Sequence, residues 1–281
     1  MKANGISPLA RLLSGLLLAF WTVCCVYPLL FSILESFKDN QQVYSGKAWD
    51  LPKLPLLWSN FSYTWEKYHF GSYFVNTIIV TTGSLILALI LTATTSYVLA
   101  RYAFKGSSLL YYLYISAMTI PTLMLIVPMF FLFDALHVSN SFTGLILLYS
   151  ISAMPMGMFM LVGFFKSLPH ELEESAVIDG ASLYGVFFKI MLPLAAPGLV
   201  TVSIVNALSF WNEYQYALVL ISDALKYTLP VGLGVMQGEM QYRIEFGPLF
   251  AGLLISTIPI LIVYIIFQRK INEGIVAGAV K

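Results

Sequence analysis

Residues 174–181 read Glu-Ser-Ala-Val-Ile-Asp-Gly-Ala, and residues 188–193, close behind, read Phe-Lys-Ile-Met-Leu-Pro. The acidic first segment, with its small residues, lies between long apolar stretches of the chain. A connection between two membrane anchors needs only a short basic turn, so a polar segment of this length indicates that something outside the bilayer binds it. The segment therefore indicates a function beyond membrane insertion, namely the binding of something outside the bilayer.

The composition places the chain in the membrane class, because 59% of its 281 residues are hydrophobic and only 10% are charged. Asp, Glu, Lys and Arg are absent from six stretches, each at least 23 residues long. A helix of that length spans about 35 Å, more than the roughly 30 Å of bilayer hydrocarbon. Buried helices of a large soluble protein would instead carry polar faces at the helical period. We therefore predict an all-α integral membrane protein with six transmembrane helices, at about residues 12–34, 73–100, 109–133, 144–165, 198–220 and 249–268.

The positions of Lys and Arg orient the chain in the membrane. Six spans put both termini on one side, and a cytoplasmic placement leaves nine of the 15 basic residues inside and six outside. Basic pairs at Arg101/Lys105 and Arg269/Lys270 adjoin span ends, where the positive-inside bias is strongest. We therefore predict a multi-pass protein of the cytoplasmic membrane with its N- and C-termini in the cytoplasm.

Two external segments are expected to make contacts. The first, between the first two spans, is rich in aromatic residues: Trp49, Trp58, Tyr63, Trp65 and Tyr68. Such rings usually lie at the bilayer interface, and contact with a partner protein is the alternative. The second segment, 222–248, is too long for a turn and too polar to insert, so we expect it to touch another molecule.

The internal connection 166–197 is predicted to form two short helices around a glycine corner. Acidic residues follow Pro169 and suit the first turn of a helix, where the helix dipole favours them. Asp179-Gly180 is a turn signal that ends this helix. Ser182 can cap a second helix, which is expected to stop at Leu192-Pro193.

Small residues at this corner, Ala176, Gly180 and Ala181, would let another backbone approach closely. The alternative is an amphipathic helix that lies on the membrane surface without a protein partner. Four acidic residues within 171–179 fit that alternative poorly, because anionic lipid repels them. We therefore favour a docking site for a protein outside the bilayer.

The pattern Glu174-Ser175-Ala176-x-x-Asp179-Gly180-Ala181, followed by Leu192-Pro193 and Pro197, resembles the EAA loop of binding-protein-dependent ABC importer permeases. Ser175 stands where that loop has its first alanine, a small-for-small change. Residues 211–214, Trp-Asn-Glu-Tyr, and the C-terminal residues 274–281 resemble the carbohydrate-uptake branch of these permeases, of the maltose-permease type. The resemblance covers nearly the whole chain.

This resemblance implies a type I ABC importer transmembrane domain, with 1–281 as a single permease domain, 166–197 as the cytoplasmic coupling loop and 269–281 as a cytoplasmic tail. It implies a permease subunit of an ATP-driven importer for a sugar, with an oligosaccharide as the expected cargo, in a bacterial inner membrane. The implied partners are a second permease in a heterodimer, two cytoplasmic ATPases, an extracytoplasmic sugar-binding protein and membrane lipid, with no nucleic acid. The residues implied to couple this chain to the ATPases are Glu174, Ser175, Ala176, Asp179, Gly180 and Ala181.

The sequence itself argues against catalysis by this chain. It contains no Gly-x-x-x-x-Gly-Lys-Ser/Thr loop for nucleotide phosphates, so ATP and Mg²⁺ are expected on the partner ATPases and no cofactor on this chain. His69, His137 and His170 are scattered, which predicts no metal site. A membrane enzyme would need a clustered catalytic set in the spans, and an ion-coupled secondary sugar carrier, the alternative function, would need paired intramembrane charges. The sequence shows neither a clustered catalytic set nor paired intramembrane charges.

Polar residues of the fifth predicted span are the candidates for the translocation pathway. Glu213 is the only acid embedded in apolar sequence, and it is predicted either to line the pathway or to make a structural hydrogen bond. Asn76, at the start of the second span, is expected to be structural. Asparagine and aromatic side chains suit sugars, since they bind hydroxyl groups and stack on pyranose rings. The candidate pathway or substrate residues are Asn206, Trp211, Asn212, Glu213 and Tyr214.

Overall fold

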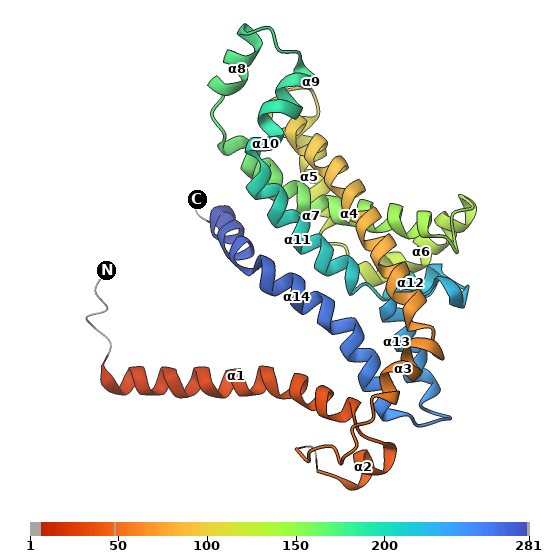
Figure 1. The fold of residues 1–281 in the computed structure, drawn as a ribbon. Helices are drawn as coiled ribbons and strands as arrows, with labels where there is room; N and C mark the ends of the chain where they lie inside the picture. The colour runs from red at the N-terminus through yellow and green to blue at the C-terminus, as the bar shows by residue number, and fades with distance from the viewer. Residues whose placement is uncertain (1–6, 48, 280–281) are drawn as a thin grey trace. The chain divides into compact units, whose positions relative to one another are not determined.

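The computed structural model describes residues 7–47 and 49–279, with side chains as far as Gln268, and every regular element in these ranges is helical. The predicted all-α class is therefore confirmed. Residues 280–281 of the predicted tail 269–281, and the side chains of the whole tail, lie outside what the structure describes. The helices are α1 Pro8–Ser36, α2 Asn40–Ser45, α3 Ser59–Glu66, α4 Phe70–Arg101, α5 Ser107–Ala117, α6 Thr122–Ala135, α7 Phe142–Ser167, α8 Glu171–Ile178, α9 Leu183–Val186, α10 Leu192–Leu194, α11 Ala196–Trp211, α12 Gln215–Leu220, α13 Leu229–Glu239 and α14 Phe246–Ala279, with a π-helical segment Phe187–Met191 and a 3₁₀ turn Ala224–Lys226 (Figure 1).

Among the described residues, four helices are long and apolar enough to cross a membrane: α1, α4, α7 and the Phe246–Gln268 part of α14. Two bent helix pairs raise the count to six if each pair forms one span. In one pair α5 and α6 meet at 106°, and in the other the segment Leu183–Leu194 meets α11 at 71°. The chain is thus a membrane protein with four to six apolar helices.

Two of the predicted spans are not single helices. The range 109–133 is divided between α5 and α6 by a turn that ends at Pro121, whose backbone is extended. Proline lacks the N–H that would continue the helix, and it disfavours helical geometry at the preceding residue. The range 198–220 is divided between α11 and α12 at residues 212–214. Pro155 and Pro259, by contrast, lie inside continuous helices.

The chain forms two compact units, the first made of Met1–Phe70 with Leu233–Ile258 and the second of Gly71–Gly232 with Pro259–Lys281. In the first unit the end of α1 packs against the start of α14, where the Phe31 and Phe250 rings meet edge to face at 5.4 Å. The Asn60 side chain donates hydrogen bonds to the carbonyls of Ser36 and Lys38, which fixes α3 to the turn after α1. The single permease domain predicted for 1–281 stays a prediction.

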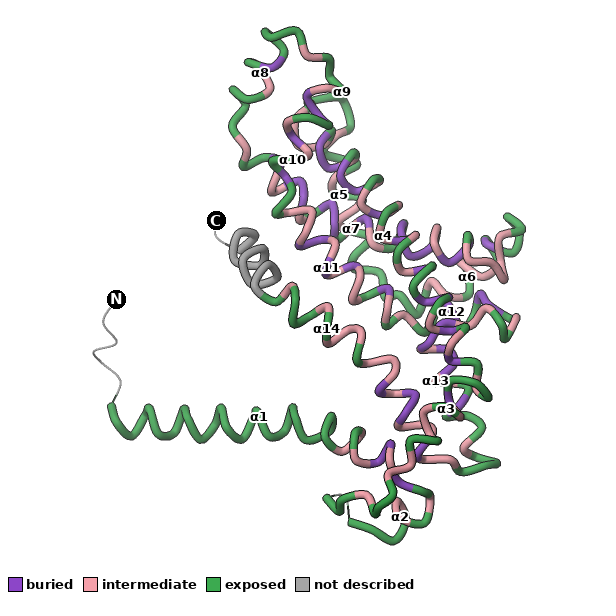
Figure 2. The backbone as a smooth tube through the Cα atoms, in the orientation of Figure 1, coloured by how far each residue is buried: buried purple, intermediate pink, exposed green. Residues whose placement is uncertain are grey.

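Helix α1 is exposed along most of its length, from Pro8 to Leu30, and Figure 2 shows this run in the colour of exposed residues. Its side chains are nearly all apolar, and none of its most apolar 18-residue window is buried. An apolar surface of this extent needs lipid or protein around it.

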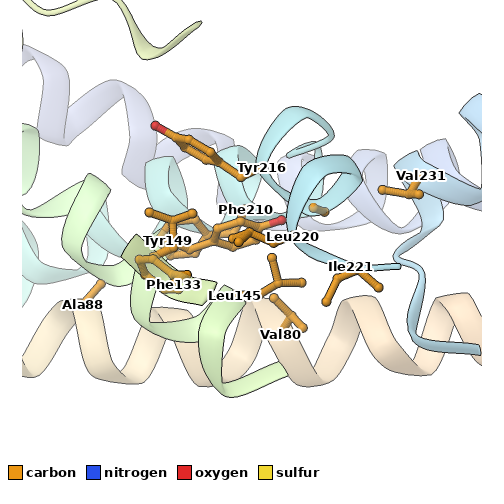
Figure 3. Close-up of a cluster of buried hydrophobic side chains, with 12 residues drawn as sticks. Val80, Ala88, Phe133, Leu145, Tyr149, Phe210, Tyr216, Leu220, Ile221 and Val231 are labelled. Atoms are coloured by element: carbon orange, nitrogen blue, oxygen red, sulfur yellow. The ribbon is translucent and has the colours of Figure 1, made fainter. Parts of the chain in front are cut away.

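The second unit is built around α4, α7 and α11. Small residues bring these helices together: a Cβ atom on Gly157 of α7 would lie 2.9 Å from the Thr92 side chain of α4 and 3.3 Å from Val202 of α11. The Asn76 side chain donates to the carbonyls of Leu225 and Tyr227, both at 2.9 Å, so its predicted structural role is confirmed. One buried cluster, shown in Figure 3, joins α4, α6, α7, α11, α12 and α13. A second cluster lies beside the acidic segment.

Candidate functional site

The acidic segment folds as the helix α8, which follows α7 after a three-residue link. Its first turn carries Glu171, Glu173 and Glu174, where backbone N–H groups are free and the helix dipole favours negative charge. The helix ends at Asp179, and Gly180 takes a left-handed conformation with φ of 83°. Glycine adopts that conformation without the steric penalty of a side chain, so the predicted Asp-Gly turn is confirmed.

The second short helix begins as predicted, because the Ser182 hydroxyl accepts the N–H of Gly185 at 3.2 Å and caps α9. Its predicted end at Leu192-Pro193 is confirmed to within one residue, because the helical run ends at Leu194 and bends by 71° before α11. The chain continues through the π-helical segment Phe187–Met191 into α10, and α11 begins at Ala196. Pro193 lies in the first turn of α10, where a missing N–H costs no hydrogen bond.

One face of α8 belongs to the chain's own core. Ala176 is 7% exposed and packs in the second buried cluster. Ala181 is half-buried against the same cluster. The small size of Ala176 therefore serves internal packing, and the expectation that another backbone approaches this residue is wrong. The cluster comprises Ala93, Tyr97, Leu161, Phe165, Ala176, Val186, Phe187, Met191, Ala195 and Val202.

The other face of the corner, residues 171–186, is open. Five large apolar side chains are exposed there. Leu172 is 37% exposed, and we call the four more exposed ones the corner patch: Val177 at 52%, Ile178 at 84%, Leu183 at 62% and Tyr184 at 80%. Glu174, Ser175, Asp179 and Gly180 are also exposed. A Cβ atom on Gly180 would meet no atom within 4 Å, so the turn has open space around it. Exposed apolar patches rimmed by polar residues mark interaction sites.

A buried ion pair fastens the corner to α4. The Nε atom of Arg101, the last residue of α4, lies 3.5 Å from Oε2 of Glu173, and its Nη2 atom donates to the Leu168 carbonyl at 2.8 Å. In the sequence, Arg101 indicates only the orientation of the chain. Nothing in the local pattern selects Glu173 among three neighbouring acids, since the pairing depends on the fold.

The pathway candidates fall into two places. Trp211, Asn212, Glu213 and Tyr214 come together at the break between α11 and α12, whereas Asn206 is buried more than one turn earlier in α11. Trp211 is half-buried, and Tyr214 is exposed. The Nδ2 atom of Asn206 is buried without a hydrogen-bond partner among the described residues.

The carboxylate of Glu213 is used by the chain itself. It accepts the N–H groups of Tyr216 at 2.7 Å and Ala217 at 3.1 Å, and so caps α12. It also accepts the hydroxyl of Tyr149, whose ring stacks on Phe210 in the centre of Figure 3. Three hydrogen bonds to one carboxylate favour the structural role over the pathway role.

No metal site is evident in the described part of the chain, where no group of three or more His, Cys, Asp or Glu side chains could hold an ion. Besides the open corner and the polar groups of α11, the described chain holds a buried ion pair between Lys38 and Glu35 in the first unit. The described residues thus form an all-helical membrane chain with a buried core under an exposed corner.

Comparison with known proteins names the family. Residues 92–276 match the family described as binding-protein-dependent transport system inner membrane component, and this chain belongs to it. The chain is 38% identical over 268 residues to the diacetylchitobiose uptake system permease protein NgcG of Streptomyces coelicolor, covering 95% of this chain and 87% of that protein. It is 32% identical to the arabinooligosaccharides transport system permease protein AraQ of Halalkalibacterium halodurans, covering 98% of each.

A solved structure supports the same fold. The chain aligns, with a TM-score of 0.82 and 23% identity, with a chain in the crystal structure of a bacterial ABC transporter involved in the import of the acidic polysaccharide alginate. The alignment covers 95% of this chain and 99% of that one. The family match includes the corner and all of α11.

Proposed function

We propose that this chain is one transmembrane permease subunit of an ATP-driven importer that receives a sugar from an extracytoplasmic binding protein. The observation that carries the proposal is the corner, because it presents an exposed apolar patch on a helix held by a buried core. Such a surface suits a partner outside the bilayer, and the family to which the chain belongs is a component of binding-protein-dependent transport systems.

The cargo we propose is an oligosaccharide. Relatives that align along nearly the whole chain are named for the uptake of diacetylchitobiose and of arabinooligosaccharides. A third, the trehalose transport system permease protein SugB of Mycobacterium tuberculosis, is 33% identical over 90% of this chain and 92% of its own length. An ion-coupled secondary carrier finds no support in these relatives.

The proposed assembly has four kinds of subunit: this permease, a second permease, the ATPases and the extracytoplasmic binding protein. A second, homologous permease would cover the exposed apolar length of α1 together with lipid, and a pair of cytoplasmic ATPases would bind the corner patch. ATP and Mg²⁺ would bind on the ATPases, since this chain has no phosphate-binding loop. The bent helix pairs count as single spans in this proposal, which gives six spans and places both termini in the cytoplasm of a bacterial inner membrane.

In the proposed mechanism α8 is the coupling helix, whose movement transmits the conformational change of the ATPases to the membrane helices. ATP binding brings the ATPases together, and the corner moves with the surface to which it is docked. Ala176 ties α8 to the core that also contains the starts of α10 and α11, so the motion reaches the membrane helices. The ATP-bound assembly must bind one orientation of the cavity more tightly than the other, because only differential affinity shifts such an equilibrium.

Within the membrane, Asn206 is the strongest candidate for contact with sugar. Its buried amide has a donor that no described residue accepts, and a sugar hydroxyl can accept it. Trp211 and Tyr214 remain pathway candidates, while Asn212 donates to the carbonyl of Leu208 at 2.8 Å and so ends α11. Glu213 is proposed as a structural cap.

Substitution of Gly180 tests the proposal. In proteoliposomes that contain the whole complex, ligand-loaded binding protein should stimulate ATP hydrolysis, and Gly180→Trp should abolish this stimulation. The indole would meet no neighbouring atom of this chain, but a side chain strains the left-handed backbone at this position, so co-purification of all subunits must show that the variant assembles. Gly180→Asn is the matched control, because asparagine tolerates the left-handed conformation and adds little bulk. Sugar uptake driven by an ion gradient, with no ATPase attached, would overturn the proposal.

A further inference from the structure

Besides the packing of Ala176 in the buried cluster, two connections lead from the corner into the membrane helices of the second unit. The first is the chain itself, which runs from α9 through the π-helical segment into α10 and α11. The second is the ion pair between Glu173 of α8 and Arg101, the last residue of α4. The second connection reaches a helix that is far from α8 in the sequence.

This ion pair is well shielded from water. The Arg101 side chain is 1% exposed and that of Glu173 is 16% exposed. The Nε and Nη1 atoms of Arg101 and the Oε1 atom of Glu173 are buried without a hydrogen-bond partner in the described chain. Exposed pairs contribute little, but removing one partner of a shielded pair leaves a buried charge without compensation.

The pair is specific within α8. Glu171 and Glu174 are exposed, and no ion pair of theirs is present among the described residues. Glu173 lies one turn before Ala176, so the two residues share a face of the helix. That face is fastened to α4 by the ion pair and to the buried cluster by Ala176, while Ile178 projects outward.

Aromatic packing around the end of α4 limits movement at the contact between α4 and the corner. The Tyr97 ring of α4 lies 4.9 Å from Phe187, in the π-helical segment, and 5.6 Å from Phe165 of α7, measured between ring centroids. Arg101 follows Tyr97 by one helical turn on α4. A guanidinium so close to a packed aromatic cluster has little freedom to follow α8 without moving the end of α4.

We propose that Arg101 is a positioning residue that transmits the movement of α8 to α4, so that the coupling helix drives the second span directly and not only the helix α11 that follows it in the chain. The inference rests on the proposed coupling function. Docking at the corner then acts on two membrane helices, α4 and α11. Within α8, Glu173 rather than its exposed neighbours transmits the movement to α4.

The test uses the whole complex in proteoliposomes. Arg101→Gln and Glu173→Gln should each leave basal ATP hydrolysis unchanged and lower its stimulation by ligand-loaded binding protein by at least about fivefold, the lower end of ordinary coupling effects. Lys105→Gln is the matched control, because it removes an exposed charge shortly after the end of α4 that has no ion pair among the described residues, and it should keep full stimulation. Co-purification of all subunits shows that each variant assembles. If Arg101→Gln does not assemble, Glu173→Gln carries the comparison alone, and Arg101→Lys, which retains the charge, should keep more stimulation than Glu173→Gln.

A covalent rescue separates transmission from mere folding. In a chain with Cys24→Ala and Cys25→Ala, the pair Arg101→Cys and Glu173→Cys should lose stimulation. A bifunctional thiol reagent with a reducible spacer should restore it, and reductant should remove it again. If the ion pair had only a structural role, stimulation would not return when the tether forms and disappear again when it is reduced.

The outcomes decide between the two proposals. If the wild-type complex responds to binding protein and the assembled Arg101 and Glu173 variants respond as strongly, the role of the ion pair is overturned while the proposed function stands. A tether that fails to restore stimulation also overturns it. A wild-type complex that hydrolyses ATP without any response to binding protein overturns the proposed function itself.

Discussion

The corner and the break between α11 and α12 are both acidic sites in the second unit, yet they use their carboxylates in opposite ways. At the break, Glu213 accepts three hydrogen bonds, from the Tyr149 hydroxyl and from two backbone N–H groups. At the corner, Glu173 is the only one of the three glutamates with an ion pair among the described residues, while Glu171 and Glu174 are exposed beside apolar side chains. A closed polar network fixes the backbone around it, whereas an open one with apolar neighbours is free to bind a partner.

The largest effect is expected at the closed site. Glu213→Ala removes the cap of α12 and leaves the Tyr149 hydroxyl without its partner. A lost cap costs about 1 kcal/mol, and a buried unsatisfied group adds about 2 kcal/mol, so unfolding should become easier by about 3 kcal/mol. Thermal unfolding of the purified chain in detergent measures the change.

Asn212→Ala is the neighbouring control. Its side chain is exposed and bonds only the carbonyl of Leu208, so stability should change by less than about 0.5 kcal/mol. A Glu213→Ala chain that unfolds like the wild type but no longer supports sugar uptake would reverse the comparison. The break would then be part of the pathway rather than a closed structural site.

The second prediction compares a substitution on the exposed face of the corner with one on its buried face. Ile178→Asp places a charge in the exposed corner patch, so the isolated chain should keep its stability to within about 0.5 kcal/mol. Binding of the ATPase pair should weaken by about tenfold or more, the effect of losing one central apolar contact. Titration of detergent-solubilised permease with the ATPase subunit measures the affinity.

Ala176→Leu is the matched change on the other face. Added volume in a packed core costs about 1–3 kcal/mol, so this variant should lose stability. Equal behaviour of the two variants, in either stability or affinity, would mean that the faces of α8 are assigned incorrectly.

Much of this architecture follows from the sequence because it depends on local rules. Four of the charge-free stretches locate the long apolar helices, Asp179-Gly180 marks the turn, and Ser182 caps the next helix, as the structure has them. Each of these features depends on residues that are neighbours in the chain. Propensity, capping and hydropathy therefore suffice to predict them.

The features that could not be predicted depend on distant residues. Glu213 and Tyr149 are 64 positions apart, so the sequence leaves open whether the carboxylate lines a pathway or caps a helix. The pairing of Arg101 with Glu173 needs the packing of α4 beside α8. The inward face of Ala176 has the same origin: a short helix of small and acidic residues shows no periodicity strong enough to reveal which side is buried.

A smaller effect on function than that of Ile178→Asp is expected at Asn206, a buried polar group that the closed network at the break does not include. Asn206→Leu replaces an amide whose donor has no described partner with an apolar side chain of similar volume, so stability should change by less than about 1 kcal/mol in either direction. If the amide bonds a sugar hydroxyl, the loss of that bond should raise the KM for sugar uptake by about 2- to 10-fold. Uptake kinetics in proteoliposomes measure the KM, and basal ATP hydrolysis should stay constant because the corner is unchanged. An unaltered KM would remove Asn206 from the pathway, and the open polar surface of this chain would then be confined to the corner.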